Sequence, residues 1–323
     1  MVRAASVALT LAVVAGCAHA KPLMAVNVPV VDLRAKPRTI AQPSIHDPLE
    51  ETQLLYGERV EVKSVRDGWA NIEAVEQPEF THANRWQGYP GWLPAAALIP
   101  ADPLAEPNTV VIARWAPTWQ DAYRRTPSPW RFPLGTYVRA VDMGGELWRV
   151  ELLDGTTVWM ASPAAKSLKE IRARSPLEER HAILRSAALL IGEAYYWGGR
   201  SPHPASHDEP LAATGVDCSG LVNVAYRTVG VVIPRDAHEQ SLRARPTASL
   251  QPADLIFLSE RGNPRRIVHV LLYAGNGEVI EGPETGLAVR RISVVKRLGR
   301  PLDQIAPGTI IDGQTVSFGS YLP

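Results

Sequence analysis

Cysteine is nearly absent from this chain. Only two of its 323 residues are cysteines, Cys17 and Cys218. Cys17 lies in an apolar N-terminal segment that we expect to be processed, so Cys218 has no partner for an intramolecular disulfide. A disulfide-stapled fold is therefore excluded. A lone thiol in an exported chain is instead a candidate reactive group.

An excess of charge is also absent. The chain has 34 basic and 33 acidic residues, a formal net charge of +1, and its basic residues are scattered. This balance argues against a nucleic-acid partner. We expect no metal and no cofactor, because the histidines of residues 201–214 lie in a proline-broken segment without the helical spacing typical of a metal site.

Apolar runs of membrane-spanning length are lacking beyond the first 20 residues, and residues 1–20 are typical of an export signal. Their apolar part, residues 4–15, is too short to remain in a bilayer as a helix. Residues 14–17 resemble the lipobox of bacterial lipoproteins, in which Cys17 becomes the lipidated N-terminus. Residues 18–20 instead fit an ordinary secretion site. The first reading predicts a lipid-anchored protein of the periplasm or cell envelope, and the alternative predicts a secreted one.

A loose repeat follows the signal. Residues 55–62 and 134–141 both alternate between apolar and polar side chains, and a tryptophan follows each copy at a similar distance. Short alternating strands separated by turn signals predict small β-barrels. The pattern resembles bacterial SH3 domains, and we assign residues 27–100 and 101–165 to two of them.

The remainder of the chain, residues 175–323, has a different character. Helical periodicity begins at residue 177, and a second helix is predicted from Cys218 to about residue 229. Four strands are expected after these helices, around residues 254–259, 267–274, 278–281 and 288–295. Helices packed on an antiparallel sheet make this an α+β domain.

Cys218 and His269 are the candidate catalytic pair. A cysteine acts as a nucleophile only when it is a thiolate, and the first turn of a helix favours that anion. Cys218 stands at the predicted start of a helix, and His269 lies 51 residues later in an apolar strand. A histidine within reach of the thiol can take its proton and later return it to a leaving amine.

Glu281 is the candidate third residue, which would orient the imidazole of His269. A turn lies between the two strands at residues 275–277. A three-residue loop would pair Glu281 with Leu271 and place it on the same face as His269. A two-residue Asn-Gly turn would place it on the opposite face. The sequence leaves both registers open.

Five motifs in one order then connect the chain to a family. They are Tyr-Tyr-Trp-Gly-Gly at 195–199, Asp-Cys-Ser-Gly-Leu-Val at 217–222, Pro-Arg-Asp-Ala at 234–237, Pro-Ala-Asp-Leu-Ile-Phe at 252–257 and His-Val-Leu-Leu-Tyr-Ala-Gly at 269–275. Together they resemble the NlpC-type cell-wall cysteine peptidases, which have a papain-like fold. With two SH3-like repeats in front, the chain resembles the γ-D-glutamyl-L-diamino-acid dipeptidyl-peptidase branch. Those enzymes cut the bond between γ-D-Glu and diaminopimelate (or lysine) in peptidoglycan stem peptides whose N-terminal L-Ala is free, and release L-Ala-D-Glu.

The resemblance implies roles for individual residues. It makes Cys218 the nucleophile and His269 the base, and it places Glu281 where the family usually has histidine or another polar residue. The residues that it assigns to the substrate site are Tyr195, Trp197, Asp217, Ser219 and Asp236. Ala237 stands where many members have serine, so one hydrogen bond to the substrate is expected to be missing.

The same resemblance assigns the substrate's free amino group to the first SH3-like domain. The matching residues are Glu58, as the counter-charge, and Tyr89, as a hydroxyl partner. A carboxylate in a closed site would reject N-acylated stems, because it would be left unpaired.

Two rival functions remain open. One is a cell-wall-binding protein whose peptidase domain is weak or inactive, which only the departure at Glu281 favours. The other is an acyltransferase or lipid deacylase of papain-like fold, against which the SH3-like repeats argue.

Overall fold

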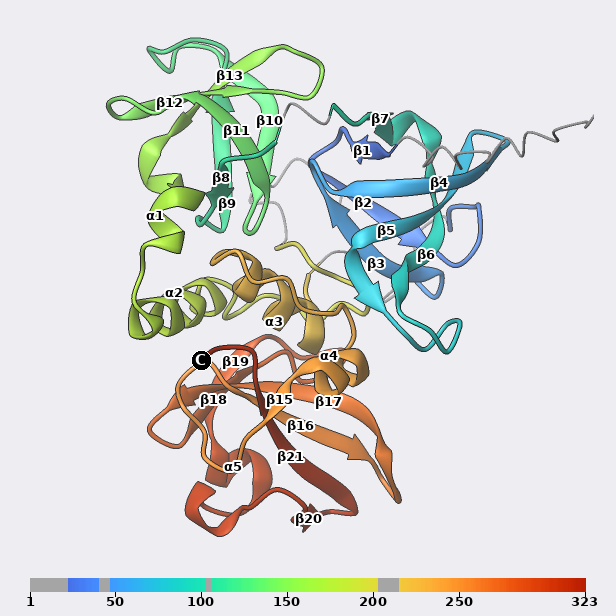
Figure 1. Cartoon of the computed structure of the whole chain (residues 1–323), viewed down its shortest axis with the longest axis vertical. Coiled ribbons are helices and arrows are strands. Elements are labelled where there is room, and N and C mark those ends of the chain that lie inside the picture. Colours follow the sequence, from blue (N-terminus) through green and yellow to red (C-terminus); the bar gives the residue numbers. More distant parts are fainter. Residues whose placement is uncertain (1–22, 41–46, 103–105, 203–214) are drawn as a thin grey trace, which may run out of the picture.

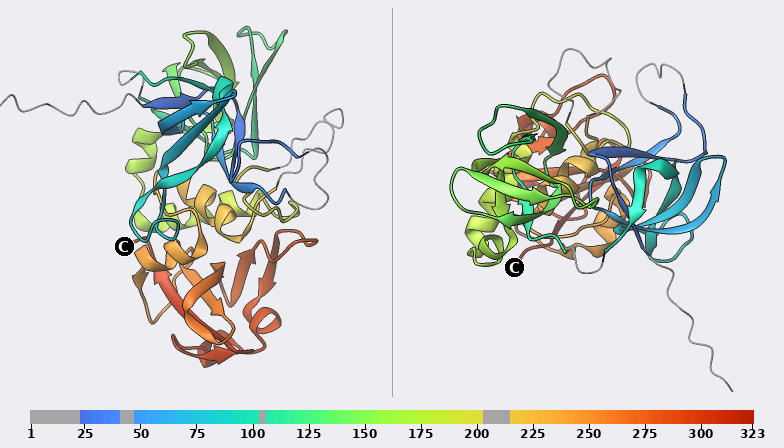
Figure 2. Two further views of the ribbon diagram at one scale, coloured as in Figure 1. Left: turned by 90° about the vertical axis from the view of Figure 1, so that its right-hand side faces the viewer. Right: turned by 90° about the horizontal axis from the view of Figure 1, so that it is seen from above.

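The computed structural model describes residues 23–40, 47–102, 106–202 and 215–323. Three sheets dominate this part of the chain (Figure 1). Two lie side by side on one side of the molecule, and the third lies on the other side (Figure 2). Helices separate the third sheet from the first two.

The first sheet has the strand order β3-β2-β6-β5-β4-β1-β7. Its strands are β1 (Met24–Val26), β2 (Val30–Arg34), β3 (Glu50–Leu55), β4 (Arg59–Arg66), β5 (Trp69–Glu79), β6 (Gln87–Pro94) and β7 (Leu98–Pro100), with the 3-10 turn η1 (Ala95–Ala97) before the last. Alternate residues of β5 are buried, which gives the sheet one apolar face.

The second sheet has the order β10-β9-β13-β12-β11-β8-β14, which is the order of the first with every strand number raised by seven. Its strands are β8 (Thr109–Val111), β9 (Trp115–Trp119), β10 (Pro127–Pro133), β11 (Tyr137–Asp142), β12 (Leu147–Glu151), β13 (Thr157–Ala161) and β14 (Ala165–Ser167), with η2 (Ser162–Ala164) before the last. The two copies of the sequence repeat lie at equivalent places, at the turns that lead into β4 and β11.

Both repeats are therefore β-rich, and the α+β class is confirmed. The two closed β-barrels predicted from the sequence are not confirmed. Among the described residues β3 and β7 each pair on one side only, as do β10 and β14, so neither ladder closes. The SH3-like assignment and the predicted domain limits remain predictions.

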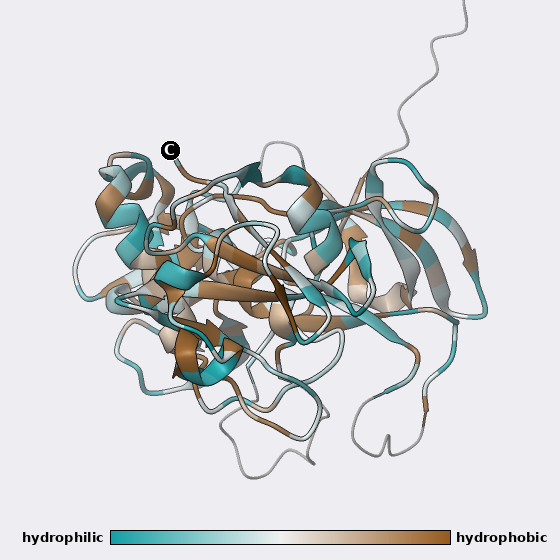
Figure 3. Ribbon diagram, turned by 90° about the horizontal axis from the view of Figure 1, so that it is seen from below, coloured by the Kyte–Doolittle hydropathy of each residue, from teal (hydrophilic) through white to brown (hydrophobic). Residues whose placement is uncertain are grey.

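The C-terminal part contains the third sheet, of order β15-β21-β16-β17-β18-β19, with β20 beside β21. Its strands are β15 (Arg245–Pro246), β16 (Leu255–Glu260), β17 (Asn263–Gly275), β18 (Glu278–Glu281), β19 (Arg290–Ser293), β20 (Ile310–Ile311) and β21 (Gln314–Ser320). The helices are α1 (Leu168–Arg172), α2 (Pro176–Ala188), α3 (Cys218–Arg227), α4 (Ala237–Arg243) and α5 (Val294–Leu298), with the 3-10 turn η3 (Leu302–Gln304). Apolar segments fill the centre of this assembly in Figure 3.

Both predicted helices form. In α2 the side chain of Ser175 accepts a hydrogen bond from the Glu178 backbone N–H, and Glu178 in turn binds the Ser175 backbone, which is a capping box. All ten residues of α3 are buried. This burial follows from the position of α3 between the third sheet and the two N-terminal sheets. None of the helices in the described ranges is long and apolar enough to cross a membrane.

Buried charges join α3 to both N-terminal sheets. Arg227, at its C-terminal end, donates to the carbonyl of Gly135 at 2.9 Å and lies over the ring of Tyr137 at 4.2 Å. The same guanidinium pairs with Glu76 at 3.0 Å and Glu58 at 3.6 Å. The helix that begins with Cys218 thus ends in a junction of three structural units.

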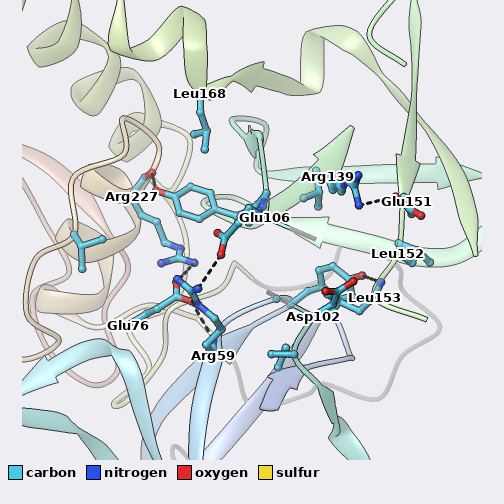
Figure 4. Close-up of a pocket in the computed structure, with 18 of the residues that line it drawn as sticks. Arg59, Glu76, Asp102, Glu106, Arg139, Glu151, Leu152, Leu153, Leu168 and Arg227 are labelled. Atoms are coloured by element: carbon cyan, nitrogen blue, oxygen red, sulfur yellow. Dashed lines mark hydrogen bonds and ion pairs between the residues drawn. The ribbon is translucent and has the colours of Figure 1, made fainter. Parts of the chain in front are cut away.

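A cavity of about 390 Å³ lies at this junction (Figure 4). Ion pairs line it, including Arg59 with Glu106 and Arg139 with Glu151. Its lining includes Arg227 but neither Cys218 nor His269. The cavity is therefore distinct from the candidate catalytic pair.

Candidate active site

Cys218 is the first residue of α3, so its thiol lies at the N-terminal end of a helix. The helix begins here because the side chain of Asp217 accepts a hydrogen bond from the Gly220 N–H at 2.6 Å. The first N–H groups of a helix lack acceptors within it, and together with the helix dipole they favour a thiolate at this position. Cys218 as a whole residue is 6 % exposed and is therefore buried.

Asp217 and Ser219 are held by internal hydrogen bonds. The second oxygen of Asp217 accepts from the Gly198 N–H at 2.9 Å and from Arg235 at 2.7 Å. The hydroxyl of Ser219 donates to Asp217 at 3.2 Å and accepts from Arg235 at 2.9 Å. In this structure both residues fix the loop and the helix around the thiol. Their predicted contact with substrate remains a prediction.

Two glycines allow neighbouring segments to approach the thiol. A Cβ atom at Gly220 would lie 2.1 Å from the carbonyl oxygen of Gly199, closer than any side chain permits. A Cβ atom at Gly282 would lie 3.4 Å from the backbone nitrogen of Cys218. The first contact seats the loop of residues 195–199 on α3, and the second brings the end of β18 against the nucleophile.

The register between β17 and β18 answers the question that the sequence left open. Gly275 pairs with Glu278 around a two-residue turn, and Asn276 and Gly277 both have positive φ. A bulge between Tyr273 and Gly275 then shifts the ladder by one residue, so that Leu272 pairs with Ile280. The turn is the shorter of the two alternatives, but the bulge restores the register of the longer one.

Glu281 consequently lies on the same face as His269. The Nε2 atom of His269 is 3.0 Å from a carboxylate oxygen of Glu281, which leaves Nδ1 for Cys218. Burial alone would lower the pKa of His269. The charge of Cys218, a hydrogen bond with its side chain and the contact with Glu281 outweigh burial and raise the pKa of His269 to about 9. His269 is thus an imidazolium at neutral pH, beside the sulfur of Cys218.

Two arginines that the sequence analysis missed complete this group. Arg290 donates to one oxygen of Glu281 at 2.7 and 3.0 Å, and Arg297 donates to the other at 2.8 Å. Burial would raise the pKa of Glu281, but hydrogen bonds with His269 and Arg297, and their charges, lower it to about 2. Arg290 could have been found from the sequence by aligning the strands β18 and β19. In that alignment Arg290 pairs directly with Glu281, and opposite charges at paired positions attract.

Tyr195 and Trp197 both belong to the loop of residues 195–199, which contacts α3 through Gly199. Tyr195 is half-buried, and burial followed by the nearby charges of Asp217 and Cys218 raises the pKa of its hydroxyl. Trp197 is 57 % exposed. Tyr195 therefore lies close to Cys218 as a neutral hydroxyl, while Trp197 is exposed to solvent, and the predicted contacts of both with substrate remain predictions.

Tyr89 and Asp236 meet across the boundary between the first sheet and the C-terminal domain. The hydroxyl of Tyr89 on β6 donates to Asp236 at 3.0 Å, and Asp236 precedes the first turn of α4. Glu51, which the sequence analysis did not single out, shares a hydrogen bond with Tyr89, and burial raises the pKa of its carboxyl. Glu51 also lies 3.9 Å from His82. The first sheet thus contributes a polar wall beside the loop that carries Asp236.

Glu58 requires a correction. Its side chain is 1 % exposed, and Arg200 binds both of its oxygens at 3.1 and 3.0 Å. Gln77 donates a further hydrogen bond at 2.8 Å. The counter-charges of Glu58 are therefore arginines inside the protein, and no oxygen is left to meet a substrate ammonium. Glu51 is the half-exposed carboxylate of the same sheet beside Tyr89.

Glu50 is a buried carboxyl group beneath the same loop. Its Cγ atom lies 2.5 Å from the place that a Cβ at Gly198 would occupy. A side-chain hydrogen bond joins it to Asp32, and neither of its oxygens has a further partner among the described residues. Burial, followed by repulsion from Asp32, raises the pKa of Glu50 to about 10. The group is therefore protonated at neutral pH.

Replacing Glu50 with Gln is expected to stabilise the protein increasingly as pH rises. In the unfolded chain glutamate ionises near pH 4.3. The raised pKa in the folded state therefore costs stability progressively from that pH towards 10. We expect a gain in the free energy of unfolding of roughly 1–3 kcal/mol at pH 7, and a smaller gain at pH 5. Urea unfolding of both proteins at pH 5, 7 and 8.5 measures the difference. A gain that does not grow with pH would show that Glu50 is ionised in the folded protein.

Cys17 and residues 203–214 lie outside the described residues. The lipidation site and most of the predicted insertion of residues 201–214 therefore remain predictions.

A cysteine on a helix N-terminus, a histidine on a facing strand and a carboxylate beyond it form an arrangement typical of cysteine-histidine hydrolases on an α+β fold. Residues 192–298 match the model of the NlpC/P60 family, and the chain therefore contains an NlpC/P60 domain. This match confirms the resemblance of the C-terminal part to the NlpC-type peptidases, and the assignment to the dipeptidyl-peptidase branch remains a prediction.

Named relatives support the same assignment. The gamma-D-glutamyl-L-lysine dipeptidyl-peptidase of Bacillus subtilis is 24% identical over 254 residues, which cover 78% of this chain and 78% of that protein. The Bacillus cereus protein of the same name is 28% identical over 251 residues, covering 75% of this chain and 70% of the relative. The fold is similar to the crystal structure of an NlpC/P60 family protein from Bacillus cereus, with a TM-score of 0.70 over 93% of this chain and 100% of that one, at 23% identity.

Proposed function

We propose that this protein is a cysteine peptidase that hydrolyses the bond between γ-D-Glu and diaminopimelate (or lysine) in peptidoglycan stem peptides with a free N-terminal L-Ala. The observation that carries the proposal is the contact of His269 with both Cys218 and Glu281. The names of the two dipeptidyl-peptidase relatives support the choice of bond.

The chemistry follows from this geometry. The thiolate of Cys218 attacks the γ-carbonyl carbon of D-Glu, and the backbone N–H of Cys218 stabilises the oxyanion. Imidazolium His269 gives its proton to the leaving amine, so that the C–N bond breaks and a thioester remains. Water then attacks the thioester, His269 takes a proton from that water and keeps it as imidazolium, and the C–S bond breaks to release L-Ala-D-Glu and the Cys218 thiolate. Glu281 keeps the imidazole in place throughout.

Recognition of the free amino group is assigned to the polar wall of the first sheet. The carboxylate of Glu51 supplies the negative charge, and the hydroxyl of Tyr89 lies beside it. An N-acetylated stem would leave that carboxylate unpaired in a partly buried place, which is costly. We therefore expect an N-acetylated stem to be a poor substrate.

The test uses the protein without residues 1–20 and the peptide L-Ala-γ-D-Glu-diaminopimelate in its free and N-acetylated forms, with products followed by mass spectrometry. Cleavage of the free peptide by the wild type but not by Cys218→Ala establishes the reaction. Loss of discrimination in Glu51→Gln, with Glu61→Gln as a surface control on the same sheet, supports the assigned amino-group site. Absence of cleavage by folded protein with a titratable thiol would favour the binding-protein or acyltransferase alternatives.

A further inference from the structure

Glu281 is paired with more positive charge than it neutralises. One carboxylate accepts hydrogen bonds from Arg290 and Arg297 and also faces His269. Even without the imidazole, two guanidinium groups face this single carboxylate. The cluster therefore carries a net positive charge at the edge of the catalytic pair.

Both arginines keep N–H donors for which the described part of the chain offers no acceptor. Arg290 binds Glu281 through Nε and Nη2, and Arg297 binds it through Nε alone. No carboxylate of the described residues other than Glu281 lies within ion-pair distance of either guanidinium. Their side chains are 39% and 23% exposed. By contrast Arg235, whose bonds lie wholly within the fold, is 0% exposed.

The place of the cluster indicates which part of a substrate it meets. In the reaction proposed above, His269 protonates the leaving amine, so the released residue occupies the histidine side of the site. The arginines adjoin the histidine, because both bind Glu281, which contacts His269. The released diamino acid carries a carboxylate on the same carbon as its departing nitrogen, and guanidinium groups bind carboxylates with strong, directional hydrogen bonds.

We propose that Arg290 and Arg297 form a subsite for the α-carboxylate of the diamino acid released from the scissile bond. The inference rests on the proposed function and makes these arginines specificity determinants of the leaving side. A free third residue, with its carboxylate intact, is then preferred over one whose carboxylate is amidated or joined to a further residue.

The test compares peptides that differ only in this carboxylate. L-Ala-γ-D-Glu-L-Lys and L-Ala-γ-D-Glu-diaminopimelate are each offered as the α-acid and as the α-carboxamide. We expect the wild type to cleave the acids with a kcat/KM at least about tenfold higher, the size of effect typical of a lost charged hydrogen bond. Arg290→Gln and Arg297→Gln are expected to lose the preference mainly through a raised KM for the acids, and Arg290→Lys to recover part of it.

Arg291→Gln is the matched control. Arg291 is the next residue on β19 and pairs with Glu278 at 2.7 Å, so its loss is expected to leave the preference unchanged. Thermal unfolding and alkylation of Cys218 show whether each variant folds. Equal cleavage of acids and amides by the wild type overturns the subsite and leaves the proposed function intact, and this comparison needs no variant. Cleavage of neither series overturns the proposed function itself. If the arginine variants lose rate but keep the preference, the arginines only position Glu281.

Discussion

Replacement of His269 with Ala is expected to lower kcat/KM by roughly three orders of magnitude, the scale of a lost general acid–base group. Besides the proton shuttle, the variant loses the imidazolium that stabilises the thiolate of Cys218. Hydrolysis of the free stem peptide measures the first loss. Alkylation of the thiol by iodoacetamide at pH 6 measures the second, because a free thiol with a pKa of about 8.5 reacts slowly there.

The alkylation assay is specific in this chain, since Cys218 is the only cysteine of the protein without residues 1–20. His238→Ala is a suitable control, because His238 lies on α4 in the same domain and accepts a hydrogen bond from the Ile267 N–H. Unchanged hydrolysis and unchanged alkylation in His269→Ala would remove His269 from the mechanism. Slow alkylation with normal hydrolysis would mean that another group transfers the proton.

Replacement of Glu281 with Gln is expected to reduce kcat/KM about ten- to hundredfold, as for a charged hydrogen bond that becomes neutral. It should also move the pH profile. In the wild type His269 holds its proton up to a pKa of about 9, so activity is expected to fall as pH rises through that value. Without the carboxylate, Arg290 and Arg297 face the imidazolium uncompensated. The pKa of His269 then falls and the alkaline limb moves to lower pH.

The measurement is kcat/KM from pH 5 to 10 for the wild type, Glu281→Gln and Glu278→Gln. Glu278 is on the same strand but pairs with Arg291, so its variant should retain the wild-type limb. An alkaline limb that stays near pH 9 in Glu281→Gln would contradict the role of this carboxylate in holding the imidazolium. Glu281 would then serve only the packing of the strand.

Local signals in the sequence were sufficient for the parts of the site that local physics determines. Capping by Asp217 and the apolar periodicity after it place the start of α3, and the alternation around His269 places its strand. The register of Glu281 was not readable, because the bulge between Tyr273 and Gly275 depends on how β17 fits its neighbours.

Glu58 shows the other limit. The alternation of residues 55–62 indicates that one face of the strand is covered, but it does not say by what. The covering group is Arg200, which is 142 residues away in the chain and belongs to the catalytic part. A carboxylate matched to an arginine of another structural unit has the same local sequence pattern as one that faces a ligand. Pairing across such distances is visible only in the folded protein.

The buried charges at the end of α3 also restrict how this architecture can be recombined. Arg200 and Arg227 belong to the catalytic part, and their counter-charges Glu58 and Glu76 belong to the first sheet. A guanidinium left buried without its carboxylate is strongly destabilising. The N-terminal part therefore cannot be exchanged for that of another protein unless the matching acidic residues are kept. A chimaera built from two relatives needs a donor segment that brings matching acids, and a minimal peptidase for engineering needs these arginines replaced before the first sheet is removed.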